Sequence, residues 1–360
     1  MKKLISFLLI LSLLLCGCTI EIVLGPEETV QPAVSTVSGG DELIVHFIDV
    51  GQADCALIEW GGFFVLIDGG NRDDGQLLVS YLEQQNVHTL NAVICTHAHE
   101  DHVGGLPSVL AVYPTERVYA PTKTYSSNVF DDFVYYADQQ RLDITIPKPG
   151  DYFTFSDGTN EIRFTILGPV KSYAETNDTS IVVKLEYGGT SFLFTGDMEV
   201  AAENDMLDYW EDRMDWNVDV LKVGHHGSTT SSGYRFVYET DPEYAIISVG
   251  EGNTYGHPHD EIVDRYSDAG VPMFRTDELG TIFAVSDGSE ITVTWENQNA
   301  APADVQPAEG FAAGFIGNKN SMKFHAPTCD SLPSEKNRVE FASYQEAIDA
   351  GYTPCGGCIG

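Results

Sequence analysis

The chain has 360 residues, of which 43% are hydrophobic and 11% aromatic, so it can bury the cores of about two domains and is not a disordered protein. Its 19 Lys and Arg residues stand against 54 Asp and Glu residues, a formal net charge of −35, so any polyanionic partner meets long-range repulsion. The excess is uneven: residues 41–296 hold 13 basic and 44 acidic residues, net −31, whereas residues 311–360 hold 4 and 5, net −1. We therefore treat these segments as separate units and interpret the acidity as a solvated surface.

The first 18 residues have the composition of a secretory leader. A basic start is followed by an apolar run over residues 4–15, which is too short to span a bilayer. The run ends in Leu15-Cys16-Gly17-Cys18, which resembles a bacterial lipobox with lipid attachment at Cys18. The sequence therefore predicts a lipoprotein signal over residues 1–18 and a flexible tether over residues 19–40, with an ordinary secreted protein as the alternative. We expect the mature chain on the extracellular face of the bacterial membrane, held by the lipid anchor only.

Beyond the tether, residues 41–296 have the pattern of a mixed α/β domain. The first three strands, two of them joined by Gly61-Gly62, predict an antiparallel opening. Later strands alternate with segments of helical spacing, and an Ala/Pro/Gln-rich linker is expected over residues 297–310. The predicted strands cover residues 43–48, 56–60, 63–68, 92–96, 163–167, 180–187, 190–195, 218–223, 244–249, 280–285 and 291–295, and the predicted helices cover residues 76–85, 130–140, 199–209 and 260–269.

The strongest functional signal is the run Thr96-His97-Ala98-His99-Glu100-Asp101-His102. It places three imidazoles and a carboxylate directly after a predicted buried strand, where α/β sheets carry their chemistry. These nitrogen and oxygen donors suit a borderline ion such as zinc, and a loop can direct alternate residues at two adjacent metals. His46, in a strand, and His88, in a polar loop, are expected to be structural.

This run is similar to the H-x-H-x-D-H signature of the metallo-β-lactamase superfamily. The similarity continues through Gly104-Gly105, Leu193-Phe194-Thr195-Gly196-Asp197 and Lys222-Val223-Gly224-His225-His226-Gly227-Ser228. Three further motifs resemble the branch of ComEC competence proteins: Phe47-Ile48-Asp49-Val50-Gly51-Gln52-Ala53-Asp54, Thr176-Asn177-Asp178-Thr179-Ser180 and Tyr255-Gly256-His257-Pro258. The resemblance covers about residues 43 to 295 and implies an α/β fold, a four-layer αβ/βα sandwich with two divalent metal ions between its sheets.

The resemblance also implies a set of metal ligands. The implied ligands are His97 and His99 for one ion, Asp101, His102 and one of His225 and His226 for the other, and Asp197 as the bridge. Which of the two adjacent histidines is the ligand stays open. No histidine lies between His102 and His225 to supply the family's further ligand, so Asp178 is assigned that place, with a turn-capping aspartate as the alternative. An oxygen donor there makes Mn²⁺ a competitor of Zn²⁺.

Such a site needs no serine or cysteine nucleophile, because two cations lower the pKa of bound water toward about 7 and stabilise negative charge on a phosphoryl or carbonyl oxygen. The residues expected to act in catalysis are Asp101, His225, His226 and His257. The non-ligand histidine of the pair or His257 would donate a proton to the leaving group, a satisfied turn histidine being the alternative for His257. Residues expected to orient ligands or line the pocket are Asp49, Gln52, Asp54 and Asp68, with local hydrogen bonding of the turn as the alternative.

Residues 311–360 carry a second metal-binding pattern, His325-x3-Cys329 followed by Cys355-x2-Cys358. Two short spacings separated by a long loop let four ligands converge tetrahedrally, as in a closed structural zinc site. The spacing resembles the zinc-binding domain of the Ada DNA-repair protein, with histidine in the first cysteine position. We therefore expect a small domain stapled by one Zn²⁺ that folds or binds rather than transfers alkyl groups. Cys55 and Cys95 are expected to be buried thiols, with a disulfide as the alternative.

The resemblance implies a metal-dependent extracellular hydrolase, most specifically a phosphodiesterase or nuclease acting on DNA. One alternative is an esterase for phosphorylcholine or another small phosphoester of the cell envelope, which would tolerate the acidic domain better. A second is a non-catalytic surface binding protein, against which the complete ligand set argues. Hydrolysis of β-lactams is the outlying possibility.

Overall fold

The structure is a computed structural model that describes residues 42–211, 213–302, 314–327, 329, 331–342 and 344–359. The leader, Cys18 and the tether lie outside these residues, as does most of the predicted linker. The domain limits therefore stay predictions. Among the described residues, no helix combines the length and the apolar character that crossing a membrane requires.

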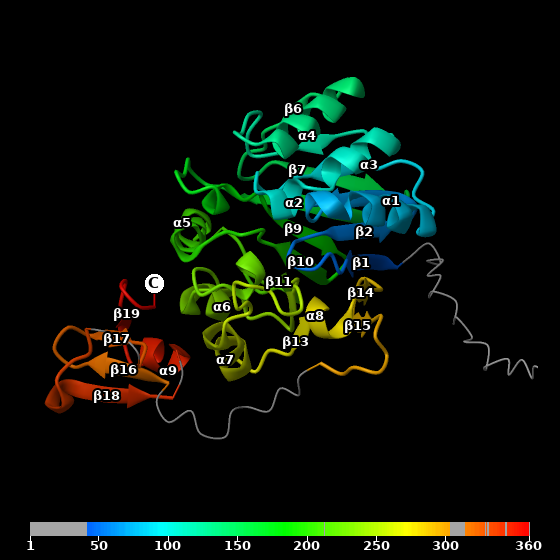
Figure 1. The fold of residues 1–360 in the computed structure, drawn as a ribbon. Helices are drawn as coiled ribbons and strands as arrows, with labels where there is room; N and C mark the ends of the chain where they lie inside the picture. Colours follow the sequence, from blue (N-terminus) through cyan, green and yellow to red (C-terminus); the bar gives the residue numbers. More distant parts are fainter. Residues whose placement is uncertain are drawn as a thin grey trace, which may run out of the picture. The chain divides into compact units, whose positions relative to one another are not determined.

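Two sheets form the framework of residues 42–302 (Figure 1). The strands of the first sheet are β1 (Leu43–Phe47), β2 (Ala56–Trp60), β3 (Phe63–Ile67), β4 (Ala92–Ile94), β5 (Val118–Tyr119), β6 (Ile144–Thr145), β14 (Ile282–Ser286) and β15 (Ile291–Trp295). Those of the second are β7 (Tyr152–Ser156), β8 (Glu161–Gly168), β9 (Val182–Tyr187), β10 (Thr190–Phe194), β11 (Val220–Lys222), β12 (Tyr244–Ile247) and β13 (Met273–Arg275). The strand orders are β15-β14-β1-β2-β3-β4-β5-β6 and β13-β12-β11-β10-β9-β8-β7.

Both sheets are mixed. The strands β1, β2 and β3 pair antiparallel, as predicted, and Gly61 and Gly62 both take positive φ in the turn between β2 and β3. From β3 to β6 the pairing is parallel, and so it is from β10 to β13. Loops that follow parallel strands gather at one edge of a sheet, which prepares the place for a site.

Helices cover the outer face of each sheet (Figure 1). They are α1 (Gly75–Gln84), α2 (Glu100–Val103), α3 (Leu106–Val112) and α4 (Asn128–Gln139) in the first half, and α5 (Val200–Trp210), α6 (Tyr234–Thr240), α7 (Asp260–Asp268) and α8 (Thr276–Leu279) in the second. One core joins the inner faces of the sheets, where Phe47 and Phe194 stack with ring centroids 6.0 Å apart. Two further cores lie beneath the helices. The result is the expected four-layer α/β sandwich.

The long elements can be predicted from the sequence, whereas the short ones cannot. Every predicted strand and helix is present, with ends that shift by up to two residues. The elements without a prediction in this domain are α2, α3, α6, α8, β5, β6, β7 and β13, most of which are too short to show a period. Cys55 and Cys95 are free and buried, so the disulfide alternative is wrong.

The C-terminal segment is a small sheet with one helix. Its elements are β16 (Phe315–Asn318), β17 (Lys323–His325), β18 (Arg338–Phe341), α9 (Tyr344–Asp349) and β19 (Thr353–Pro354), in the strand order β18-β16-β17-β19. Its core is largely aromatic and includes Phe315, Phe324 and Phe341. Such a small core gives little stability by itself, which fits the expectation of a metal staple.

Candidate metal centre

The predicted ligands come together where strands of both sheets end. The run from His97 to His102 follows β4, and Asp197 follows β10. His225 and His226 lie in the short turn η3 (Gly224–Gly227), one residue after β11, and neither has helical backbone angles. Both take left-handed φ values, 49° and 54°, which cost about 1 kcal/mol or more for a residue with a side chain. Backbone strain of this kind collects at functional sites.

Asp197 is the hub of the cluster. Its Oδ1 lies 3.2 Å from Nε2 of His102. Its Oδ2 lies 3.8, 3.7 and 3.8 Å from the Nε2 atoms of His97, His225 and His226. Two further contacts complete the cluster: Asp101 Oδ2 is 3.5 Å from His226 Nε2, and His99 Nδ1 is 3.1 Å from His97 Nε2. One carboxylate facing four imidazoles has the position that a bridging ligand needs.

The donor atoms fit divalent cations. Asp101, His102, Asp197 and His226 each offer an atom within 4.8 Å of the others. Three of these atoms, Nε2 of His102, Nε2 of His226 and Oδ1 of Asp197, are buried and make no hydrogen bond within the described part of the chain. Buried polar atoms without a partner are costly unless something else binds them. An N/O set of this kind suits Zn²⁺ or Mn²⁺, and His97 and His99 extend it to a second ion.

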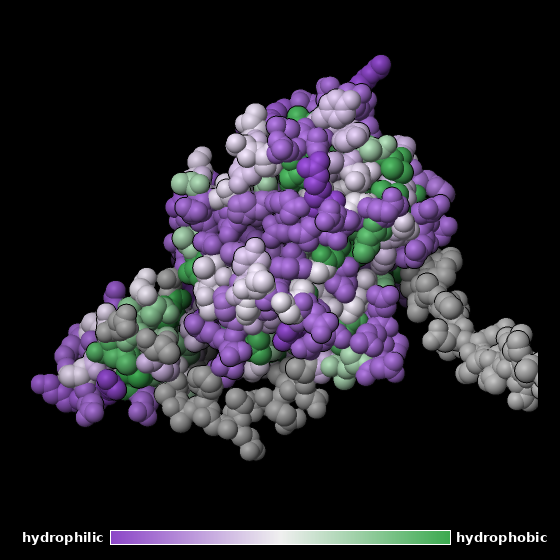
Figure 2. All heavy atoms as spheres, in the orientation of Figure 1, coloured by the Kyte–Doolittle hydropathy of each residue, from purple (hydrophilic) through white to green (hydrophobic). Residues whose placement is uncertain are grey.

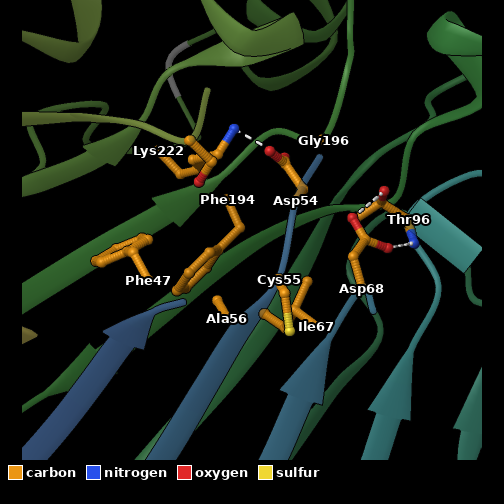
Figure 3. Close-up of a pocket in the computed structure, with 11 residues that line it drawn as sticks. Phe47, Asp54, Cys55, Ala56, Ile67, Asp68, Thr96, Phe194, Gly196 and Lys222 are labelled. Atoms are coloured by element: carbon orange, nitrogen blue, oxygen red, sulfur yellow. Dashed lines mark hydrogen bonds and ion pairs between the residues drawn. The ribbon is translucent and has the colours of Figure 1, made fainter. Parts of the chain in front are cut away.

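Behind the ligands, carboxylates hold the far nitrogens of the imidazoles. Asp68 Oδ2 accepts a hydrogen bond from Nδ1 of His102 at 2.8 Å, and Thr96 donates to the same carboxylate through N and Oγ1 at 2.7 and 2.6 Å (Figure 3). His226 Nδ1 lies 2.9 Å from Ser248 O and 3.2 Å from Asp54 Oδ1. With Nδ1 donating, each imidazole turns its Nε2 lone pair toward Asp197. Asp54 and Asp68 therefore orient ligands, as predicted.

A buried lysine, Lys222, lies beside the carboxylates that orient the ligands. Lys222 Nζ lies 2.7 Å from Asp54 Oδ2 (Figure 3). It also donates to Val223 O at 2.8 Å. Both side chains of the pair line a cavity of about 10 Å³ between the sheets. Lys222 belongs to a motif that suggests the family, but the sequence analysis gives it no role. A lysine in an otherwise apolar strand, β11, is the signal that could have revealed it.

The structure distinguishes the two adjacent histidines. His226 is 2% exposed, and its Nε2 faces both Asp101 and Asp197. The side chain of His225 is 22% exposed, and its Nδ1 lies 2.9 Å from Thr230 Oγ1. We therefore assign His226 to the ligand set with Asp101 and His102. His225 stays at the outer side of the cluster, within reach of a substrate.

Charge is concentrated at the centre. Burial alone would lower the pKa of His226, but Asp197 and Asp54 outweigh it and raise that pKa to about 10. Burial opposes ionisation of Asp197, yet His102 and His226 hold its pKa well below the usual range. Without bound metal, protons on His102 and His226 thus balance the carboxylates, whereas burial and His102 hold the pKa of His97 well below its usual value. A divalent cation must displace such protons when it binds.

In the structure Asp178 hydrogen-bonds the start of α5, and its place among the metal ligands stays a prediction. Its Oδ1 accepts a hydrogen bond from the backbone N of Glu199, at the start of α5, at 3.1 Å. Burial raises its pKa, and the charged groups that add to the shift are Glu199, Glu175 and Asp205, none of them a histidine. This contact is with a residue 21 positions away, so it is not the local capping of its own turn that the alternative describes.

Ser180 and Gly196 position Asp197. Ser180 Oγ accepts a hydrogen bond from Asp197 N at 3.0 Å and lies 3.5 Å from His97 Nδ1. Gly196 has φ +52°, and a Cβ there would lie 2.8 Å from Ser180 Oγ. Only glycine allows this close approach, which presents the Asp197 carboxylate to the histidines.

The remaining predicted residues divide in two. Asp49 Oδ1 accepts from Gly51 N at 3.1 Å, so it serves its own turn, the local alternative. Gln52 contacts a distant segment of the chain. Its Oε1 accepts a hydrogen bond from Gly250 N at 3.2 Å, and its Nε2 lies 3.4 Å from His257 Nδ1. The ring of His257 lies 5.7 Å from that of His225, beside the centre. His257 thus lies beside the centre, where burial and the neighbouring imidazoles of His226 and His225 lower its pKa to about 4.

The tail ligands also converge. His325, Cys329, Cys355 and Cys358 each offer an atom within 4.8 Å of the others. Parallel pairing of β17 with β19 brings His325 beside Cys355, and His325 Nδ1 lies 3.3 Å from Cys329 Sγ. The cysteines are free thiols. Burial opposes ionisation of Cys355, but the Gly357 N–H and the neighbouring thiols lower its pKa, which favours a thiolate ligand.

Two family models match the chain. The model of the metallo-beta-lactamase superfamily matches residues 48–251. The model of the metal binding domain of Ada matches residues 305–359. The first match contains every residue of the metal cluster described above, and the second contains all four tail ligands.

Several curated proteins are similar in sequence. ComE operon protein 3 of Bacillus subtilis is 30% identical over 257 residues, which are 66% of this chain and 32% of that protein. Recombination protein 2 of Haemophilus influenzae is 30% identical over 234 residues, 61% of this chain and 26% of that protein. Competence protein ComA of Neisseria gonorrhoeae is 28% identical over 244 residues, which are 67% of this chain and 32% of that protein. The match thus spans about a third of these relatives or less.

Among solved structures, the metallo-beta-lactamase fold protein YhfI from Bacillus subtilis covers 71% of this chain and 100% of its own. Its sequence is 12% identical, and the TM-score is 0.44.

Proposed function

Since the chain belongs to the metallo-β-lactamase superfamily, in its ComEC-like branch with a C-terminal zinc-binding domain, we propose that it is a phosphodiesterase that cleaves DNA. The family makes it a metal-dependent hydrolase, and the phosphodiester substrate is the proposal. The observation that carries it is the buried set of unpartnered nitrogen and oxygen atoms around Asp197. When bound there, divalent cations supply a Lewis acid and lower the pKa of water, the chemistry that phosphoryl transfer to water requires.

The residues of the chain have separable tasks in this reaction. Asp68 and Asp54 fix the tautomers of His102 and His226, so that each Nε2 faces inward. His225 and His257 lie at the outer side and are partly exposed. His225 can hold a proton for the oxygen that leaves the phosphorus atom, whereas His257, with its pKa lowered to about 4, lies beside it as a neutral ring. A departing alkoxide of DNA is strongly basic, so this proton donation lowers the barrier.

The choice of DNA comes from the relatives. Several are named for competence or recombination, activities in which DNA is handled. The match spans only part of those proteins, so their activity is carried over as a proposal. The competing substrate is a small phosphoester such as a phosphorylcholine ester, because a domain with net −31 repels a polyanion.

A comparison of hydrolysis rates decides between these substrates. The metal-loaded protein is assayed on single-stranded DNA, double-stranded DNA, bis(p-nitrophenyl) phosphate and a phosphorylcholine ester, with Asp197→Ala as the inactive control. We expect cleavage of DNA and of the small diester, both abolished by Asp197→Ala. Hydrolysis of a small ester with no detectable DNA cleavage would move the assignment to the small phosphoester.

We propose in addition that the mature chain is anchored by lipid on the outer face of the cell membrane. The support is the lipobox-like Leu15-Cys16-Gly17-Cys18, which lies outside the described residues. Mass spectrometry of the native protein should find an acylated Cys18 at the mature N-terminus. Cys18→Ser should leave the chain unprocessed or release it from membranes, and an unmodified Cys18 in the native protein would refute the anchor.

A further inference from the structure

An exposed aromatic ring, that of Tyr255, lies near the metal centre and is separated from it by His257. Tyr255 is 67% exposed, the largest exposed fraction among the exposed large hydrophobic side chains of the described residues. Its ring stacks on that of His257, with centroids 5.6 Å apart and planes inclined by 23°. The ring of His257 in turn lies 5.7 Å from that of His225. A series of rings thus leads from solvent to the ligands.

The loop that carries Tyr255 is held in place. The Oδ1 of Asn253 accepts hydrogen bonds from Tyr255 N at 3.2 Å and His257 N at 3.0 Å, and its Nδ2 donates to His257 O at 2.6 Å. Gln52 connects the same loop to the other half of the domain through Gly250 N. Tyr255 is therefore exposed although its backbone and one face of its ring are fixed. A rigid ring loses little conformational entropy when a ligand packs on its free face.

Few Lys and Arg side chains of this domain are available to bind the phosphates of DNA. Eight of the 13 Lys and Arg residues in residues 41–296 lie within 4.0 Å of a carboxylate: Arg72, Lys123, Lys171, Lys184, Lys222, Arg235, Arg265 and Arg275. Three more, Arg117, Arg163 and Arg213, lie over aromatic rings. Figure 2 shows a predominantly hydrophilic face on this domain, and acidic residues outnumber basic ones. Affinity from phosphate neutralisation is therefore small.

We propose that Tyr255 is a stacking platform for an unpaired base next to the scissile phosphate, so that the substrate of this site is single-stranded DNA. The inference rests on the proposed phosphodiesterase function. Every base has a π-face, so stacking requires neither a particular sequence nor a basic groove. Bases in a duplex are stacked on each other and paired, which leaves no free face for the tyrosine. Tyr255 is thus a binding residue, whereas the histidines behind it carry the chemistry.

The test compares Tyr255→Ala with Tyr255→Phe, which keeps the ring. The matched control is Tyr152→Ala, because Tyr152 is also exposed (59%) and packs on Arg163, but on strand β7. Each protein is assayed on a single-stranded oligonucleotide and on the same strand with abasic sites on both sides of one phosphodiester. Binding of the intact strand is measured separately by fluorescence anisotropy. We expect Tyr255→Ala to raise KM and Kd about 5- to 100-fold, the loss of one base stack, with kcat within about twofold.

Tyr255→Phe and Tyr152→Ala should have the KM and Kd of the wild type. In the wild type, the abasic strand should raise KM by the same factor, whereas Tyr255→Ala should not respond to it. Affinity should not fall as salt rises from about 50 to 200 mM, since few phosphates are neutralised. Unchanged KM and Kd in Tyr255→Ala, or a steep loss of affinity with salt, would overturn the platform while DNA cleavage persists. Base-dependent binding without cleavage would overturn the phosphodiesterase and keep the platform, and neither binding nor cleavage would overturn both.

Discussion

Lys222 and Asp54 form a buried ion pair that connects the second sheet to the first behind the metal centre, with Nζ and Oδ2 2.7 Å apart. The two residues are 4% and 5% exposed. Lys222 ends β11, and Asp54 precedes β2, with its backbone N donating to Asp101 O at 3.1 Å. The pair therefore joins the two sheets and also holds Asp54 beside the ligand His226.

We expect Lys222→Met to lower the free energy of unfolding by about 3–5 kcal/mol, because it leaves Asp54 buried without its countercharge. Unfolding is followed in urea with a chelator present, so that metal binding does not contribute. The double variant Lys222→Met, Asp54→Asn should regain part of the loss. Lys123→Met, which breaks the exposed pair with Asp143, is the control and should cost less than about 1 kcal/mol. Equal losses in the two single variants would contradict the role of burial.

Asp197 and Asp178 should respond differently to substitution. Asp197→Ala removes the carboxylate that faces four imidazoles, so we expect loss of hydrolysis and of the metal at the catalytic centre, with the zinc of the tail retained. Asp178→Ala removes only a hydrogen bond to Glu199 N, so metal content should stay at the wild-type value while stability falls by about 1 kcal/mol. Elemental analysis of the purified proteins and chemical unfolding measure both effects. Loss of metal in Asp178→Ala would place it in the ligand set.

The sequence predicts most of the framework because the long strands and helices carry their own period. The antiparallel opening from β1 to β3 follows from apolar runs and a Gly-Gly turn, both of which are local signals. The four-layer arrangement is different, since no local pattern tells which face of a sheet meets another sheet. It came from the resemblance, carried by motifs such as His97 to His102, and the cores between and outside the sheets confirm it.

For the site, the sequence identifies residue types and the structure identifies their partners. The clustered histidines from His97 to His102 signal a metal site by themselves, whereas the rest of the ligand set is what the resemblance implies. Asp178 was assigned by its place in the chain, and its contact in the structure, Glu199 N, is 21 residues away. Ser180 and Lys222 had no assigned role, because their contacts come from other strands. Long-range pairing of this kind cannot be inferred from one sequence.

The zinc site of the tail should be independent of the catalytic centre. We expect Cys355→Ser to remove one zinc ion per chain, because Ser is a poor ligand, and to unfold the segment around it, since for so small a unit metal binding supplies the folding energy. Hydrolysis of a small diester should be unchanged. Elemental analysis and limited proteolysis measure the two effects. Met322→Ala, an exposed residue between β16 and β17, is the control and should keep the zinc.

Glu203 gives the catalytic domain a pH-dependent stability. It lies in α5, is 2% exposed, and accepts hydrogen bonds from Ser232 N at 2.6 Å and Gly233 N at 2.8 Å. Burial raises its pKa from 4.5 to about 7, although these two N–H groups and Arg265 oppose the rise. The folded chain thus binds this proton more tightly than the unfolded chain.

The contribution of Glu203 is therefore fully present below about pH 4.5 and is lost as the pH rises to about 7. The full change amounts to about 3 kcal/mol. Glu203→Gln, which cannot titrate, should remove this component, so that the difference in unfolding free energy between wild type and variant changes across this interval and is constant above it. Urea unfolding at several pH values, with chelator, measures the difference. Because Gln offers one N–H₂ group to a site that needs two acceptors, the variant should be less stable at every pH, and only the pH dependence of the difference tests the titration. A difference that does not vary with pH between about 4.5 and 7 would show that Glu203 is ionised throughout, its charge held by the two N–H groups and by Arg265.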